Sequence, residues 1–264
     1  QITDGDENVT AFVYPQSVFS EVGTYNVMII VPASGNYSSL VKNLTVVVGT
    51  ARIGDVIYET VDDAINASIA GDEIVLVSNG SIDSNNIVPE NITISTNNFT
   101  LTINLDVENN GTLHGNIVSE GHDITNDGTI NGILTLRGNL VNNGTFTGSY
   151  EIIGDVTNNG EITLNADSPV DGSYTENANT TYITNDATLT ITGTFGGSGK
   201  VEVQKGTLLD NTASTYDGLT IIVSGGSTFE KNSDTIVGTN GLVTLSTSEA
   251  SVTITKNNST FNLN

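Results

Sequence analysis

The sequence predicts an all-β protein whose larger part is a parallel β-helix, a solenoid of about ten coils. The first observation is a motif that occurs four times, at residues 109–113, 126–130, 142–146 and 158–162, with its glycines 17, 16 and 16 residues apart. The second is a regular alternation of apolar and polar side chains within each copy. The third is the composition: 36% hydrophobic residues, 28 Gly and no Trp suit a narrow core better than a thick globular one.

Residues 1–49 are predicted to form a β-module of their own. Residues 9–13, 24–31 and 41–48 alternate as strands do. Apolar side chains share one face of each of the two longer strands: Tyr25, Val27, Ile29 and Val31 in one, and Leu44, Val46 and Val48 in the other. Both faces need to be covered.

The stretch 20–48 resembles the closing strands of bacterial or archaeal immunoglobulin-like surface modules. Gly23-Thr24-Tyr25 and the later pair Asn36-Tyr37 carry the match. The resemblance implies a spacer or adhesive stalk of a cell-surface protein. A complete sandwich takes about seven strands and close to 100 residues, so only a partial module is expected here. Three sources could supply the missing strands: residues removed by processing, packing against the solenoid cap, or another subunit.

Residues 50–264 are predicted to form the solenoid, with a short helical cap at its beginning. Thr60 and Asp63 form a capping box. The helix then shows one apolar stripe, made of Val61, Ala64, Ile65 and Ile69. The stretch 51–78 resembles the N-terminal cap of β-helix surface proteins and, more distantly, of pectate-lyase-like chains. We place the first coil at Ile74.

The repeat predicts an interior asparagine ladder. Asn109, Asn126, Asn142 and Asn158 each follow an aliphatic residue by two positions, so they share its inward face. Coils stacked about 4.8 Å apart let each amide bond to the next, which satisfies a buried polar column.

Three glycine columns predict three corners for each coil and a roughly triangular section. The Asn-Gly corner, at Gly111, Gly128, Gly144 and Gly160, is expected to be a left-handed turn. The second corner lies at Gly115, Gly132 and Gly148, and the third at Gly121, Gly138 and Gly154.

The period loosens after Gly160. An insertion is expected around residues 167–181, and a weaker copy of the motif at 185–189. Residues 200–203, 219–223, 242–245, 251–255 and 260–263 still alternate as strands. No capping helix is predicted at the C-terminal end, which we expect to be open.

The formal charge of −23 argues against nucleic acid and anionic membranes as partners, since both are polyanions. Its simplest interpretation is a solvated surface that keeps strand edges apart. Calcium is the one cofactor that this charge leaves open; residues 4–7 (Asp-Gly-Asp-Glu) resemble a calcium loop only weakly. No apolar run is long enough to span a bilayer. Because the chain begins at Gln1, we expect a processed or excised product.

Catalysis is the sharper alternative, because right-handed β-helices include polysaccharide lyases and hydrolases. Such enzymes need clustered carboxylates and, in lyases, a basic residue on the groove. Arg52 and Arg137 are the only arginines, and Asp106, Asp123 and Asp155 form an exterior column near Arg137 that could bind a cation. His114 and His122 lack a third ligand for a transition metal. We therefore expect no enzymatic activity and no catalytic, metal or cofactor-binding residues.

Twelve Asn-X-Ser/Thr sequons suggest a glycosylated extracellular protein. They lie at Asn8, Asn36, Asn43, Asn66, Asn79, Asn91, Asn98, Asn110, Asn143, Asn179, Asn257 and Asn258. A glycan-binding module would expose aromatic rings, for which the candidates are Tyr150, Tyr174, Tyr182 and Tyr216.

The function expected from these observations is a structural or adhesive role at a microbial cell surface. The expected form is a self-assembling filament or a surface-layer subunit, joined end to end through the N-terminal module and the open end of the solenoid. Surface glycans are the other expected partners. The alternative is a carbohydrate-active β-helix enzyme or a glycan-binding module.

Overall fold

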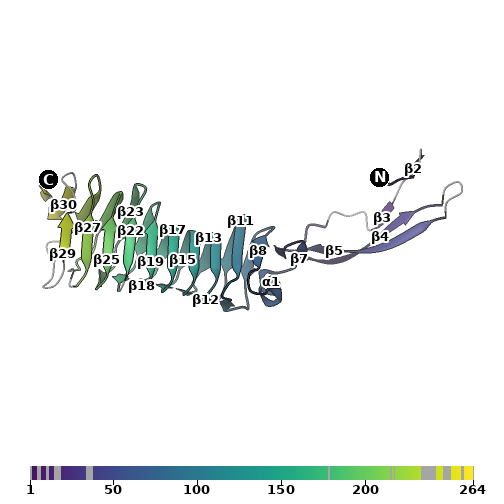
Figure 1. Ribbon diagram of the computed structural model, residues 1–264, viewed down its shortest axis with the longest axis horizontal. Coiled ribbons are helices and arrows are strands. Elements are labelled where there is room, and N and C mark those ends of the chain that lie inside the picture. Colours follow the sequence, from purple (N-terminus) through teal and green to yellow (C-terminus); the bar gives the residue numbers. More distant parts are fainter. Residues whose placement is uncertain are drawn as a thin grey trace.

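The computed structural model is an elongated rod with a long hairpin projecting from one end (Figure 1). It describes residues 2–4, 7–9, 12–14, 19–33, 38–177, 179–214, 216, 218–232, 242–245, 251–256 and 259–263. Side chains are described for residues 12–13, 19–33, 38–177, 179–214, 216 and 218–232. Strands make up 60% of the chain and helix 3%, and the rod is a β-solenoid of about nine turns, close to the ten expected.

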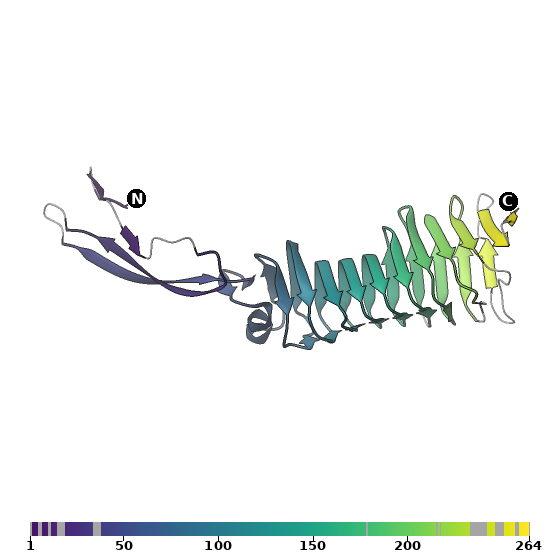
Figure 2. The ribbon, with the colours of Figure 1, turned by 180° about the vertical axis from the view of Figure 1, so that it is seen from behind.

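Two small antiparallel sheets precede the solenoid. The strands β1 (Ile2–Asp4) and β2 (Glu7–Val9) pair with each other. The N-terminal sheet contains β3 (Phe12–Tyr14), β4 (Gly23–Val31) and β5 (Leu40–Val48). Seen from behind, this sheet extends away from the cap (Figure 2). In the part of the chain that the structure describes, this sheet consists of three strands, and an immunoglobulin-like sandwich is not confirmed.

The predicted apolar side chains of β4 and β5 lie on the same face of the sheet. Tyr25 pairs with Val46, and Val27 pairs with Leu44. Val27 is buried, yet Leu44 remains 40% exposed. A sheet of this size without a second layer leaves apolar surface in water.

The cap forms as predicted from its capping box. The strands β6 (Ala51–Ile53) and β7 (Val56–Tyr58) make a hairpin, and β6 pairs antiparallel with β8 (Glu73–Leu76). The helix α1 (Val61–Ala67) begins after Thr60, whose Oγ1 accepts a hydrogen bond of 3.0 Å from the backbone N–H of Asp63. Ile69 lies beyond the end of the helix and is 72% exposed, so its predicted place in the apolar stripe is wrong.

Helix α1 is also tied down by Asp62, which the sequence did not single out. Its buried carboxylate accepts hydrogen bonds from the backbone N–H groups of Asp83, Ser84 and Asn85, at 2.9, 3.3 and 2.8 Å. These bonds compensate for removing the charge from water.

The first half of the solenoid stacks one bent strand and one short strand in each coil. The bent strands are β11 (Thr93–Ile103), β13 (Thr112–Glu120), β15 (Thr129–Arg137) and β17 (Thr145–Ile153); β8 and β9 (Gly80–Ile82) precede them. The short strands form a seven-stranded sheet: β10 (Ile87–Val88), β12 (Val107–Asn109), β14 (Ile124–Asn126), β16 (Leu140–Asn142), β18 (Val156–Asn158), β21 (Tyr174–Glu176) and β24 (Phe195–Gly197). Successive coils pair in parallel.

The second glycine column bends a continuous strand instead of separating two strands. Gly115 and Gly132 pair with each other inside β13 and β15, with φ of 112° and 154°.

The Asn-Gly column differs from its prediction. Gly111, Gly128, Gly144 and Gly160 are not left-handed. A Cβ at Gly144 would lie 2.0 Å from the carbonyl oxygen of Gly128, so close stacking, and not φ, requires glycine there.

Later coils are longer and divide the bent strand in two. The two consecutive strands of each such coil are β19 (Glu161–Leu164) and β20 (Ser168–Asp171), β22 (Thr180–Ile183) and β23 (Ala187–Ile191), β25 (Lys200–Val203) and β26 (Gly206–Asp210), and β27 (Thr220–Val223) and β28 (Thr228–Lys231). Residues 167–181 therefore continue the solenoid. Asn185 and Asp186 form a left-handed turn at the bend, and the equivalent of Asn158 is Glu176.

The last described strands are β29 (Leu242–Leu245), β30 (Ser251–Lys256) and β31 (Ser259–Leu263). Strand β31 turns back and pairs antiparallel with β30. No helix covers this end within the described residues.

Candidate functional site

The asparagine ladder forms as predicted, inside the solenoid. All four side chains are fully buried. The Nδ2 of Asn109 donates to Oδ1 of Asn126 at 2.7 Å, Asn126 donates to Asn142 at 2.7 Å, and Asn142 donates to Asn158 at 2.8 Å. The second N–H of each of the first three amides donates to a backbone carbonyl of the next coil, such as Glu161 O at 3.1 Å from Asn142. The amide donors are thereby satisfied without water.

The two ends of the ladder differ. At the N-terminal end, Asn109 pairs in register with Val88, and its Oδ1 has no hydrogen-bond partner in the described part of the chain. At the C-terminal end, Asn158 donates to both carboxylate oxygens of Glu176, at 2.9 and 3.0 Å. One N–H of each amide is therefore directed along the column, toward the end at which the carboxylate of Glu176 lies.

Glu176 is a fully buried acid held by neutral groups. Thr181 donates to its Oε2 at 2.5 Å, and the Thr181 hydroxyl lies 2.6 Å from that of Tyr174. Burial raises the pKa of Glu176 from 4.5 to about 7, against the hydrogen bonds from Asn158 and Thr181 that favour the ionised form. The sequence could have indicated this residue, since it lies 18 positions after Asn158, close to one repeat.

A second interior polar cluster lies nearer the C-terminal end, where Asp210 and Lys231 face each other on neighbouring strands. Both side chains are 0% exposed, and Lys231 Nζ lies 2.6 Å from Oδ2 of Asp210. Lys231 also donates to the carbonyls of Thr212 and Ser214, at 3.0 and 2.7 Å. Tyr216 donates its hydroxyl proton to Asp210 Oδ2, and its ring lies 4.7 Å from Lys231 Nζ. The repeat columns in the sequence give no sign of this pair, because its two residues are 21 positions apart in lengthened coils.

The exterior aspartate column has a structural role in the described coils. Oδ1 of Asp106 accepts from the backbone N–H of Asp123 at 2.9 Å, and Oδ1 of Asp155 accepts from that of Ser173 at 2.8 Å. Asn139 completes the column between Asp123 and Asp155. Each carboxylate therefore binds the coil that follows it. No group of three or more His, Cys, Asp or Glu residues that could hold a metal is found among the described residues.

The candidate basic residues are engaged locally. Arg137 Nε lies 2.9 Å from Glu120 Oε2 of the neighbouring coil, so Arg137 is engaged in an ion pair. Arg52 donates to the carbonyl of Gly54 at 2.8 Å. His122 Nδ1 lies 3.7 Å from Asp106 Oδ1, and His114 is exposed on the outer face of β13. These residues do not converge on one site.

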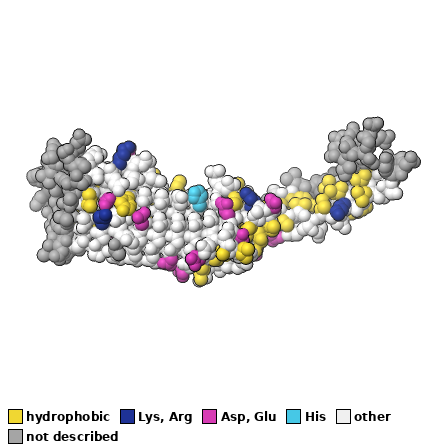
Figure 3. Space-filling view, in the orientation of Figure 1, with side chains coloured by type: hydrophobic (Ala, Val, Ile, Leu, Met, Phe, Trp, Pro, Cys, Tyr) yellow, Lys and Arg dark blue, Asp and Glu magenta, His cyan; other side chains and the backbone are white. Residues whose placement is uncertain are grey.

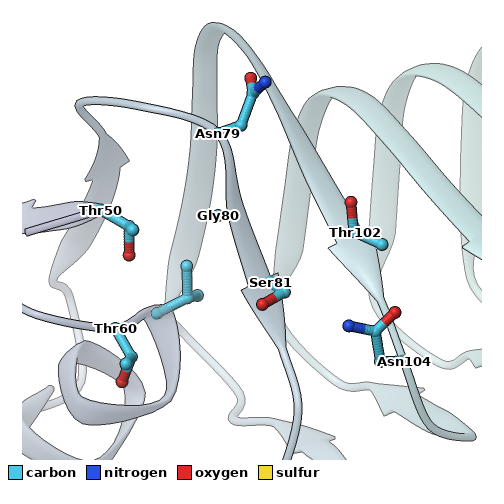
Figure 4. Close-up of a pocket in the computed structure, with 8 residues that line it drawn as sticks. Thr50, Thr60, Asn79, Gly80, Ser81, Thr102 and Asn104 are labelled. Atoms are coloured by element: carbon cyan, nitrogen blue, oxygen red, sulfur yellow. The ribbon is translucent and has the colours of Figure 1, made fainter. Parts of the chain in front are cut away.

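Two shallow concave surfaces are lined mainly by polar residues and glycine. One, of about 360 Å³, lies between the cap and the first coils and is lined by Thr50, Thr60, Val61, Asn79, Gly80, Ser81, Thr102 and Asn104 (Figure 4). Its side chains largely bond within the protein, as when Asn104 donates to Asp83 at 2.6 Å. The other, the His114 groove of about 520 Å³, is lined by Ser95, Thr96, Asn97, Asn98, His114, Gly115, Asn116, Gly132 and Ile133.

Three of the four tyrosines considered as sugar platforms are in the core. Tyr150, Tyr174 and Tyr216 are buried, and only Tyr182 is partly exposed. Tyr174 and Tyr216 each pack against the ring of Phe195, with centroids 5.9 and 5.4 Å away. The buried three cannot stack on a sugar in solution.

Most described sequons lie at the surface. Asn43, Asn66, Asn79, Asn91, Asn98, Asn143 and Asn179 are exposed and Asn110 is half-buried, whereas the side chains of Asn8, Asn36, Asn257 and Asn258 lie outside the described part. The side chains of the weak calcium-loop candidate, residues 4–7, also lie outside the described part. Asn143 takes part in an exterior amide column, donating to Asp127 and accepting from Asn159, both at 2.8 Å.

No protein-family model matches the chain, and no curated protein or solved structure is significantly similar to it. No helix among the described residues is long and apolar enough to cross a membrane.

Proposed function

We propose that this protein is a non-enzymatic structural or adhesive rod of a microbial cell surface that joins other copies of itself end to end. The observation that carries the proposal is the contrast between the two parts of the molecule. The solenoid buries its apolar side chains in a continuous core, whereas the N-terminal sheet leaves its own exposed.

The solenoid supports a rod-like role because each coil is paired to the next along its whole length. Parallel pairing runs from β8 to β30, and the interior amides continue the same stacking. Such an array resists bending and leaves little unpaired backbone for proteases. This role requires no cofactor.

The N-terminal sheet supports self-association. Hydrophobic side chains gather along it (Figure 3), and Leu40 and Val41 are each 56% exposed. The outer edge of β5 pairs with no further strand among the described residues. In a chain with a formal charge of −23, residues 19–33 and 38–48 carry only Glu21 and Lys42, so this edge is not protected by repulsion.

An end-to-end contact would join this edge to the C-terminal end of another copy, where β31 pairs only with β30 in the described part of the chain. Because two different surfaces would meet, the contact would not close on itself and would extend into a filament. Exposed sequons agree with an extracellular location.

Light scattering and electron microscopy of the full chain test the proposal. We expect linear assemblies whose length rises with concentration, and Val41→Lys should abolish them. Ile133→Lys is the matched control, because Ile133 is also 56% exposed but lies on the solenoid. A monomer at all concentrations, or equal loss of assembly in both variants, would contradict the proposal.

Glycan binding is the second candidate, and the amide side chains that line the His114 groove favour it. Asn97, Asn98 and Asn116 could offer amide donors and acceptors to sugar hydroxyls. A glycan array with the full chain and with His114→Ala tests this binding.

A screen on pectins and alginates with calcium tests the enzymatic alternative: sugar release abolished by Arg137→Ala would contradict a non-enzymatic role.

A further inference from the structure

We propose that Lys231 and Asp210 condense to an amide bond that cross-links two neighbouring coils of the solenoid. The two residues are direct partners on the parallel strands β26 and β28, so the bond can form without moving the backbone. The amine nitrogen already lies 2.6 Å from one carboxyl oxygen, and both side chains are 0% exposed.

Each carboxyl oxygen has the contact that acyl transfer requires. Oδ1 of Asp210 accepts the backbone N–H of Thr212 at 2.8 Å, which can stabilise negative charge on that oxygen in the tetrahedral intermediate. Oδ2 accepts the hydroxyl proton of Tyr216, which can protonate it as it leaves. Burial, followed by the charge of Asp210, raises the pKa of Tyr216 well above its usual value, so the phenol keeps its proton until it is needed.

The dry interior favours condensation over the ion pair. Two charged side chains cost free energy to remove from water, whereas the amide that replaces them carries no charge. Groups held in contact also react as though at an effective concentration of about 10⁵–10⁸ M.

The reaction balances without an oxidant or a cofactor. After a proton passes from Lys231 to Asp210, the lone pair of Lys231 Nζ attacks Cγ of Asp210 and forms the N–C bond. The Cγ–Oδ2 bond then breaks, and Oδ2 leaves as water with two of the three protons of the original ammonium group, one relayed by Tyr216. Oδ1 becomes the amide oxygen, and Nζ keeps one proton.

The mass of the full chain, measured after denaturation, tests the proposal directly. We expect the peptide 206–256 from a trypsin digest to be lighter than its sequence by one water, since an acylated Lys231 is not cleaved. Cleavage after Glu230 should then leave the two halves joined. A peptide of unmodified mass from the folded protein would overturn the proposal.

Variants show whether the lost water comes from the bond between Lys231 and Asp210 or from another reaction. Lys231→Met should have its unmodified mass, whereas the matched variant Lys200→Met, which removes a surface ion pair with Glu202, should still lose water. Asp210→Asn should lose ammonia and reach the same cross-linked product. Tyr216→Phe should slow the reaction. Water loss from 206–256 that persists in Lys231→Met would also overturn the proposal.

Discussion

The amide of Asn142 donates one interior hydrogen bond along the ladder and accepts another, so its replacement affects two neighbours. We predict that Asn142→Leu costs about 1–3 kcal/mol for each amide left without its partner. Asn109→Leu should cost less, because it leaves only Asn126 without a donor and removes an oxygen that has no partner. Urea unfolding of both variants measures the difference.

Asn143→Leu is the matched control for this comparison, because Asn143 is the exposed neighbour of Asn142. Asn143→Leu should lower the free energy of unfolding by less than Asn142→Leu does. Equal losses in all three variants would show that the interior position of the amides does not matter.

Glu176 makes stability depend on pH. An acid whose pKa is higher in the folded state binds its proton more tightly there, so its contribution is fully present below pH 4.5 and is lost as the pH rises to about 7. The free energy of unfolding should fall by about 3 kcal/mol over this window. We predict that Glu176→Gln removes this fall and stabilises the protein at neutral pH, as measured by urea unfolding at several pH values.

Glu161→Gln changes an exposed carboxylate of the neighbouring coil and should leave the pH profile of the wild type intact. If the free energy of unfolding of Glu176→Gln still falls as steeply between pH 4.5 and 7, the fall comes from other groups and the prediction is wrong.

At the scale of the element, the Asn-Gly corner depends on the distance between coils. We predict that Gly144→Ala destabilises the protein by about 3 kcal/mol, because its Cβ would overlap the backbone of Gly128. Gly196→Ala is the control: no atom lies within 4 Å of a Cβ there and the residue is not left-handed, so the change should stay within about 1 kcal/mol. Thermal unfolding of both variants gives the comparison.

The elements that the sequence predicts well are those of constant period. Because inward side chains recur every 16 or 17 residues, β13, β15 and β17 and the ladder could be placed from alternation alone. The left-handed turn predicted at the Asn-Gly corner was wrong. Glycine is required both where φ is positive and where two coils stack closely, and the sequence does not distinguish these two causes. The pair Asp210–Lys231 was missed because the coils lengthen after Gly160, and a fixed period then no longer identifies partners. Glu176 lies within two residues of the expected step but was missed because it is not an asparagine.

At the scale of the whole molecule, the two parts should differ in resistance to proteases. Lys42 is exposed on β5, which pairs only with β4 among the described strands, whereas Arg137 lies in β15 between β13 and β17. We predict that limited trypsin treatment cuts after Lys42 before it cuts after Arg137 or Lys200, and leaves a fragment 43–264. Mass spectrometry identifies the first product; an initial cut after Arg137 would contradict the rigidity of the solenoid.

The stacked Asn-Gly corners also bear on chemical ageing. Asn-Gly sequences deamidate when the nitrogen of the glycine attacks the asparagine side chain to form a succinimide, which requires freedom in both groups. Here the N–H of Gly144 donates to the carbonyl of Asn126 at 2.8 Å, and that of Gly160 donates to the carbonyl of Asn142 at 2.9 Å. The side chains of Asn143 and Asn159 are held in the exterior amide column. The contacts that hold the coils together therefore keep these asparagines from deamidating for as long as the rod stays folded.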